Sequence, residues 1–133
     1  MPSMLKATLE HLKSDKSSVR TYELLIVDDG SSDGTSDLAL DFAKDNSDAE
    51  VRVVTLHKNQ GKGGAVRHGM LHGRGRRLLM VDADGASRFE DLELLWKAVS
   101  EFMTKEDAPA IAVGSRAHLV KTEAVVKVRI VHS

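Results

Sequence analysis

The stretch Tyr22 to Gly34, which reads YELLIVDDGSSDG, decides the fold of this 133-residue chain. Its first six residues are apolar apart from Glu23, and they predict a buried β-strand. The strand stops at Asp28 and Asp29, and the Gly, Ser and Asp residues after them are typical of a turn that starts a helix. The sequence therefore predicts a strand–loop–helix unit with two carboxylates at the carboxyl end of its strand.

The same organisation recurs along the chain. Strands are expected at 22–27, 51–56, 78–81 and 110–113, and helices at 4–12, 38–43, 65–72 and 92–103. Alternating strands and helices predict an α/β protein whose parallel sheet is covered by helices on both faces. Ligands of such folds bind beyond the carboxyl ends of the strands, where the polar clusters of this sequence fall.

Composition excludes several classes of protein. Hydrophobic residues make up 41% of the chain and charged residues 29%, which is typical of one soluble globular domain. A net charge of −1 argues against binding nucleic acid through a basic surface. The absence of cysteine excludes disulfides, thiolate nucleophiles and cysteine-built zinc sites. We also expect neither a membrane-spanning segment nor a signal peptide, because no apolar run is long enough.

A pair of carboxylates, Asp82 and Asp84, follows the expected strand at 78–81. At positions i and i+2 of an extended segment, both point to the same side. Oxygen ligands of this kind suit Mg²⁺ or Mn²⁺, which would hold a diphosphate. The alternative is that both are solvated turn residues. Histidine offers no comparable site, since His68 and His72 lack a third ligand at metal-binding spacing.

A glycine-rich loop, Asn59 to Gly64 (NQGKGG), follows the expected strand at 51–56. Its Gly61, Lys62 and Gly63 predict a phosphate-binding loop, because glycines let backbone N–H groups approach an anion and lysine adds charge. The loop differs from a Walker A motif, since neither Ser nor Thr follows the lysine. The alternative is a flexible turn.

Two further polar clusters end predicted strands. Asp28 and Asp29 are expected to accept hydrogen bonds from a nucleoside, or else only to form the turn and cap the next helix. Ser115 and Arg116 would offer a hydroxyl and a guanidinium to a phosphate, although a solvated arginine fits the pattern equally well. The basic group at 67–77 (Arg67, Arg74, Arg76 and Arg77) is expected to be a solvated face, with anionic lipid headgroups as its alternative partner.

A phosphoryl-receiver domain is the alternative from a different functional class. It has a similar length and also carries an acid pair after an early strand. However, the sequence shows no fifth strand that ends in the lysine such a domain needs. The receiver interpretation also leaves the glycine-rich loop without a role.

Four motifs together resemble the family 2, GT-A-type glycosyltransferases. They are YELLIVDDGSSDGTSDLA, VRVVTLHKNQGKGGAVRHGM, LLMVDADGASRF and IAVGSRAHL, and they span roughly residues 2–119. The second and third motifs resemble the dolichyl-phosphate β-glucosyltransferase members more than the mannosyl-phosphate synthases, which are the alternative within the family. The resemblance implies an incomplete Rossmann-like GT-A domain that binds a nucleotide sugar, with a mostly parallel sheet and helices on both faces.

The resemblance also implies substrates and residue roles. UDP-glucose would be the donor and dolichyl phosphate the acceptor, with inversion at the sugar carbon, for protein N-glycosylation. Asp28 and Asp29 would contact uridine, Gly61, Lys62 and Gly63 the donor phosphates, Asp82 and Asp84 the donor and a Mg²⁺ or Mn²⁺ ion, and Ser115 and Arg116 the acceptor phosphate. No residue is implied as a general base, because a phosphate acceptor is already an anion.

The resemblance further implies a location at the cytosolic face of the endoplasmic reticulum membrane. The family has a membrane anchor and a first strand before the part that this chain resembles, and a long continuation after it. We therefore expect residues 1–119 to form a partial GT-A domain and 120–133 an atypical tail. The strand-like alternation at 125–132 falls where the family pattern has a helix. The chain alone is expected to be inactive, with membrane contacts supplied by segments it lacks.

Overall fold

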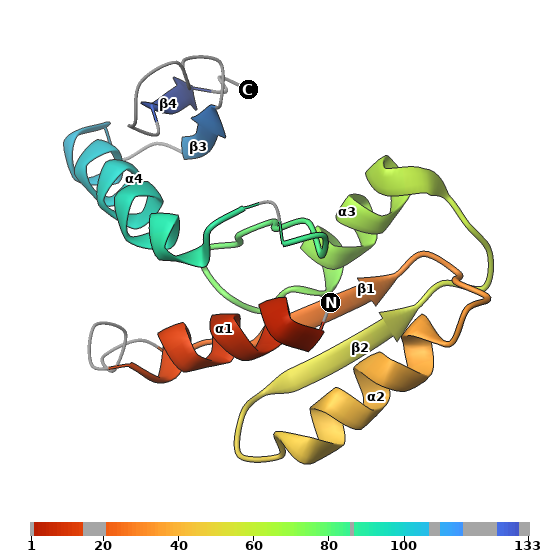
Figure 1. The fold of residues 1–133 in the computed structure, drawn as a ribbon. Helices are drawn as coiled ribbons and strands as arrows, with labels where there is room; N and C mark the ends of the chain where they lie inside the picture. The colour runs from red at the N-terminus through yellow and green to blue at the C-terminus, as the bar shows by residue number, and fades with distance from the viewer. Residues whose placement is uncertain (1, 15–20, 86, 107–109, 116–124, 131–133) are drawn as a thin grey trace. The chain divides into compact units, whose positions relative to one another are not determined.

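The computed structural model describes residues 2–14, 21–85, 87–106, 110–115 and 125–130 of the chain (Figure 1). The elements in chain order are α1 (Pro2–Lys13), β1 (Leu24–Asp28), α2 (Thr35–Asp45), β2 (Val51–Thr55), α3 (Gly61–His72), the 3-10 turn η1 (Phe89–Asp91), α4 (Leu92–Glu106), β3 (Ala110–Ser115) and β4 (Val125–Ile130). They divide into two compact units, Met1–Ser87 and Arg88–Ser133.

Strands β1 and β2 of the first unit form a parallel pair. The ladder runs in register from Leu24 opposite Val51 to Asp28 opposite Thr55. Because side chains alternate along a strand, Leu24 and Ile26 lie on one face of the pair, with Leu25 on the other. The prediction of parallel strands is confirmed for this pair.

One face of the pair carries the hydrophobic core. Leu5 and Leu9 of α1 lie one helical turn apart and pack with Phe42 of α2, and all three are buried. Partly buried residues that include Ile26 and Val51 of the strands complete this cluster. Burying side chains of this size is worth roughly 1.5–3 kcal/mol each, so the cluster fixes both helices on this face.

Helix α3 covers the opposite face of the pair, as the sequence predicts (Figure 1). A Cβ atom added at Gly69 would lie 3.3 Å from Cγ2 of Val27, so the helix backbone runs close to β1. Arg52, which also points to this face, donates to the carbonyl oxygen of His72 at the end of α3. Unlike α2, α3 contains no buried residue.

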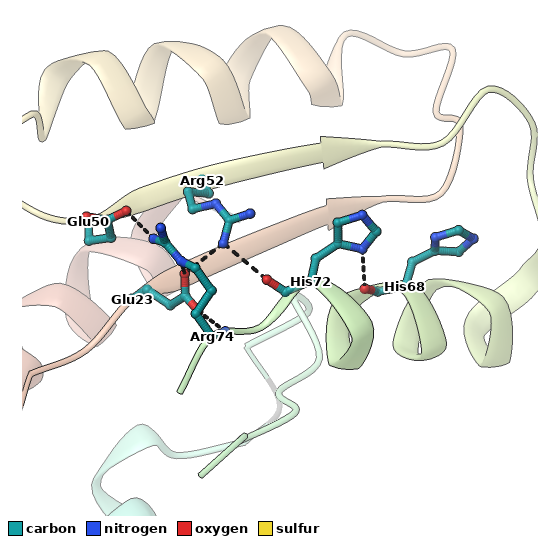
Figure 2. A network of polar contacts seen from close by, with 6 residues as sticks. All are labelled: Glu23, Glu50, Arg52, His68, His72 and Arg74. Carbon is teal, nitrogen blue, oxygen red and sulfur yellow. Dashed lines mark hydrogen bonds and ion pairs between the residues drawn. The ribbon is translucent and has the colours of Figure 1, made fainter. Parts of the chain in front are cut away.

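Polar contacts hold the end of α3 against the starts of both strands, as Figure 2 shows. The carboxylate of Glu23 accepts from the backbone N–H and Nε of Arg74 and from Nη1 of Arg52. Arg74 also pairs with Glu50. We call Glu23, Glu50, Arg52 and Arg74 the Glu23 network. Arg74 is thus held in ion pairs, while its side chain stays 59% exposed, in keeping with the solvated face predicted for its basic neighbourhood.

The second unit joins a helix to an antiparallel strand pair. In α4, Leu95, Trp96 and Val99 belong to the apolar stripe that predicts this helix. Strand β3 pairs antiparallel with β4, from Ala110 opposite Ile130 to Ser115 opposite Val125. The expected strand at 110–113 is therefore confirmed, but its pairing is antiparallel. At 125–130 the structure follows the strand-like alternation of the sequence and not the helix that the family pattern implies.

The strand expected at 78–81 is wrong. Among the described residues, β1 and β2 pair only with each other, so this segment has no ladder in which to form a strand. Leu78 instead lies beside Gly73, where an added Cβ would come within 2.7 Å of its Cδ2. The side chains of Leu78, Leu79 and Met80 remain 43–47% exposed.

The structure confirms the α/β class, and its described strands form two two-stranded sheets, of which β1–β2 is parallel and β3–β4 antiparallel. The boundary expected between residues 119 and 120 lies outside the described residues and stays a prediction. None of the helices in the described part of the chain has the length and apolar character needed to cross a membrane.

The Glu23 network makes stability depend on pH. The backbone N–H of Arg74, together with both guanidinium groups, lowers the pKa of Glu23 from 4.5 to about 2. A carboxyl group whose folded pKa is depressed stabilises the fold fully above its unfolded value, and this contribution disappears as pH falls through the folded value. We expect the stability difference between wild type and Glu23→Gln to shrink from pH 4.5 toward pH 2. Denaturant unfolding across this range measures it, and a constant difference would contradict the assignment.

Candidate functional site

The loops that follow β1 and β2 touch through their backbones. The N–H of Leu56 donates to the carbonyl oxygen of Asp28 at 2.9 Å. Gly30 has φ of 73° and sits so close to the second loop that an added Cβ would lie 2.9 Å from the backbone of both Lys58 and Asn59. The parallel pairing therefore brings the two predicted binding loops together at one edge.

Asp28 is buried and hydrogen-bonded inside its own loop. Its Oδ1 accepts from the N–H and hydroxyl of Ser31 at 3.2 and 2.5 Å, and its Oδ2 accepts from the hydroxyl of Ser36 in α2. Burial by itself would raise the pKa of Asp28, but these hydrogen bonds outweigh it and hold the pKa below its ordinary value. Asp28 therefore ties the loop to the start of α2.

Asp29 connects the first loop to the glycine-rich loop. Its Oδ1 accepts the backbone N–H of Gln60 at 2.7 Å. The side chain of Asn59 accepts the N–H of Gly61 at 3.0 Å, which places the start of α3 four residues before the expected position at 65. The interpretation of 59–64 as only a flexible turn is thus not what the structure shows, since Gly61 to Gly64 form the first turn of a helix.

Lys62 connects the glycine-rich loop to the acid pair. Its Nζ lies 2.7 Å from Oδ2 of Asp82, and both side chains are partly exposed. Asp84 is exposed and lies two residues further on, just before the turn at Gly85. The structure therefore brings the Lys62 loop and the first acid of the pair into direct contact.

The acid pair fits one kind of metal ion better than others. No group of three or more His, Cys, Asp or Glu side chains within the described residues is arranged to hold a metal. Two exposed carboxylates alone suit a hard cation such as Mg²⁺, which keeps several waters and takes further ligands from phosphates. Asp82 and Asp84 would therefore suit a Mg²⁺ ion that takes its remaining ligands from water and from phosphates.

The second unit contains the other predicted site. Ser115 is the last residue of β3, whereas Arg116 lies outside the described residues. Their contact with an acceptor phosphate stays a prediction.

The sequence pattern did not indicate the roles of some connecting residues. Asn59 accepts a hydrogen bond within its own loop, the N–H of Gln60 connects the two loops, and the hydroxyl of Ser36 bonds to Asp28 and Thr55. The signal that points to Ser36 is its place in the first turn of α2, where a hydroxyl lies near the end of the preceding strand. For Gln60 the contact uses only the backbone N–H, which every residue except proline provides.

Taken together, the fold and these loops define an α/β protein with a polar site beyond the carboxyl ends of parallel strands. The profile of the family "Glycosyl transferase family 2" matches residues 2–118. The chain belongs to glycosyl transferase family 2. This match leaves the phosphoryl-receiver interpretation without support.

Named relatives agree with this membership. The chain is 46% identical over 123 residues to "Dolichyl-phosphate beta-glucosyltransferase" of Mus musculus, and 44% identical over 123 residues to the protein of that name from Homo sapiens. It is 45% identical over 132 residues to the protein of the same name from Saccharomyces cerevisiae. These alignments cover 91–93% of this chain but only 38–39% of each relative. No solved structure matches the chain.

The close approach of the two loops yields a test. Gly30 and Gly34 both have positive φ, 73° and 83°, but a Cβ at Gly34 would meet nothing within 4 Å. We expect Gly34→Ala to cost about 1–2 kcal/mol from backbone strain alone. Gly30→Ala should cost about 1–3 kcal/mol more, because its Cβ also pushes the loops apart. Denaturant unfolding of both variants measures the difference in their free energies of unfolding. Equal losses of stability would show that the close packing of the two loops at Gly30 does not contribute to stability.

Proposed function

We propose that this chain forms the donor-binding part of a dolichyl-phosphate β-glucosyltransferase. The observation that carries the proposal is the 44–46% identity over about nine tenths of the chain to proteins of that name. The contact between Lys62 and Asp82 supports it, because it joins a cation and a carboxylate at the edge where a nucleotide sugar would bind.

Different residues would bind different parts of the donor. The carboxylate of Asp29 would accept a hydrogen bond from uridine in addition to the one from the N–H of Gln60. The buried Asp28 would hold the loop that carries Asp29 in place. Lys62 and the N–H groups in the first turn of α3 would bind the diphosphate, since these N–H groups have no acceptor within the helix. UDP-glucose is the donor proposed for this arrangement.

Asp82 and Asp84 would hold a divalent cation, Mg²⁺ or Mn²⁺. Such an ion, when bound, neutralises charge on a leaving diphosphate. Lys62 is the partner of Asp82 in the ligand-free chain. A cation on Asp82 would therefore release Lys62 toward the phosphates, so that cation and nucleotide favour each other's binding.

The proposed reaction is an inverting displacement. An oxygen of dolichyl phosphate forms a bond to C1 of glucose, the bond from C1 to the diphosphate oxygen breaks, and UDP leaves with the electron pair. The acceptor is an anion at neutral pH, so no general base is required. The contribution of the protein is then positioning and charge stabilisation. We propose that the protein works at the endoplasmic reticulum membrane, on its cytosolic face, with Ser115 and Arg116 approaching the acceptor phosphate.

Donor choice is the decisive measurement. The chain and the longest product of its gene should be assayed with dolichyl phosphate and either UDP-glucose or GDP-mannose. We expect transfer from UDP-glucose by the longest product. Transfer only from GDP-mannose would replace the proposal with the mannosyl alternative.

Lys62→Ala should weaken the binding of UDP-glucose by about tenfold or more, the size expected for a lost charge-assisted hydrogen bond. UMP, which lacks the second phosphate, should lose much less. Calorimetric titration of both ligands into the 133-residue chain measures this, with Lys44→Ala, an exposed lysine of α2, as the control. Equal losses for the two ligands would show that the loop has only a structural role.

Asp84→Ala should remove the dependence of UDP binding on Mn²⁺ while the chain stays folded, because the side chain is exposed. Titrating UDP with and without Mn²⁺ compares the two states, and circular dichroism checks the fold. Asp91→Ala removes an acid outside the site and should leave the Mn²⁺ dependence as in wild type. An Asp84→Ala protein that keeps the full Mn²⁺ effect would remove this residue from the proposed site.

A further inference from the structure

Helix α3 carries the glycine-rich loop, yet hydrophobic burial does little to hold it. None of its twelve residues is buried, whereas α1 buries Leu5 and Leu9 and α2 buries Phe42. Its close approach to the strands is at Gly69, beside Val27. The position of α3 must therefore depend strongly on polar contacts at its ends.

The Glu23 network supplies those contacts at the carboxyl end. Glu23 precedes β1 and its side chain is only 14% exposed, whereas its partners Arg52 and Arg74 are 33% and 59% exposed. Arg52 also donates to the carbonyl oxygen of His72 at 3.1 Å. Figure 2 shows Glu23, Arg52 and Arg74 meeting where α3 ends. One carboxylate thus fixes the chain directly after α3 to both strands.

The amino end of the same helix carries Lys62. A helix of this length spans about 18 Å, and its hydrogen-bonded backbone transmits a displacement of one end to the other. At the amino end, the backbone N–H of Gln60 bonds to Asp29, and the flexible side chain of Lys62 reaches Asp82. Glu23, whose carboxylate accepts three hydrogen bonds and has little exposure, is therefore the stronger of the two attachments.

We infer that Glu23 is a positioning residue for Lys62: by fixing the end of α3, it sets where this lysine meets the diphosphate of a nucleotide. The inference rests on the proposed function for the identity of that ligand. Nothing in it requires Glu23 to touch the ligand, because Glu23 lies at the opposite end of the strands from the loops.

Hydrogen exchange of the ligand-free chain tests the transmission through α3. Glu23→Gln keeps the shape of the side chain but removes its charge. We expect faster amide exchange along the hydrogen-bonded part of α3, from 65 to 72, and at 73–74, with β1 and β2 little changed. Asp41→Asn, which removes an exposed ion-paired carboxylate of α2, should leave exchange in α3 as in wild type. Faster exchange confined to 72–74, or none, would overturn the inference.

Binding tests the consequence for Lys62. We expect Glu23→Gln to weaken UDP binding in Mn²⁺ by about tenfold, the effect of losing one charge-assisted contact, and to leave uridine binding unchanged. In a Lys62→Ala background, Glu23→Gln should cause little further loss, because the two residues then act on one interaction. Losses that simply add, or an equal loss for uridine, would show that Glu23 acts on the fold as a whole.

Hydrogen exchange and UDP binding together distinguish the positioning role of Glu23 from the proposed function. Wild-type chain that binds no UDP would count against the proposed function, and the exchange result would then decide the role of Glu23 alone. Normal UDP binding together with unchanged exchange in Glu23→Gln would overturn the positioning role and leave the proposed function standing.

Discussion

In-register parallel pairing of β1 with β2 is the constraint on which the rest of the first unit depends. It ends both strands at the same edge, with Asp28 opposite Thr55. The loops that leave this edge then have to pack against each other, which explains both the hydrogen bond from Leu56 to Asp28 and the glycine at position 30. A side chain at Gly30 would occupy the space of the second loop.

Carboxylates carry out different tasks at the two ends of the strands. At the carboxyl ends, Asp28 is satisfied by hydroxyl groups, while Asp29 and Asp82 are partly open to solvent and contact Gln60 and Lys62. At the other end, Glu23 is shielded and surrounded by two guanidinium groups. A carboxylate with as little exposure as Glu23 is stable in a protein when cations and N–H donors pair with it in this way. The exposed acids remain accessible to a ligand, and the shielded acids stabilise the framework around them.

Local pattern was sufficient to predict much of this fold, and non-local pairing explains the failures. Short, mainly apolar runs located β1 and β2, and helical spacing located α1, α2 and α4. The run at 78–81 has the same character, yet an apolar run reports a tendency toward burial and cannot specify a ladder partner. The predicted loops that end strands of the first unit do come together, because parallel topology requires it. Which side chains pair could not be predicted, since Glu23 and Arg74 are 51 residues apart in sequence.

The alternation of the parallel pair also determines which changes of chain length the protein tolerates. On β2, Val53 and Val51 share the core face, while Arg52 faces α3. If one residue were inserted between Val51 and Arg52 and Val51 kept its partner, the residues from Arg52 onward would exchange faces, and the guanidinium would move toward the apolar cluster. An insertion in an exposed connection would leave both faces unchanged. Over the strands of this unit, selection should therefore act against insertions and deletions more strongly than against exchanges among apolar residues.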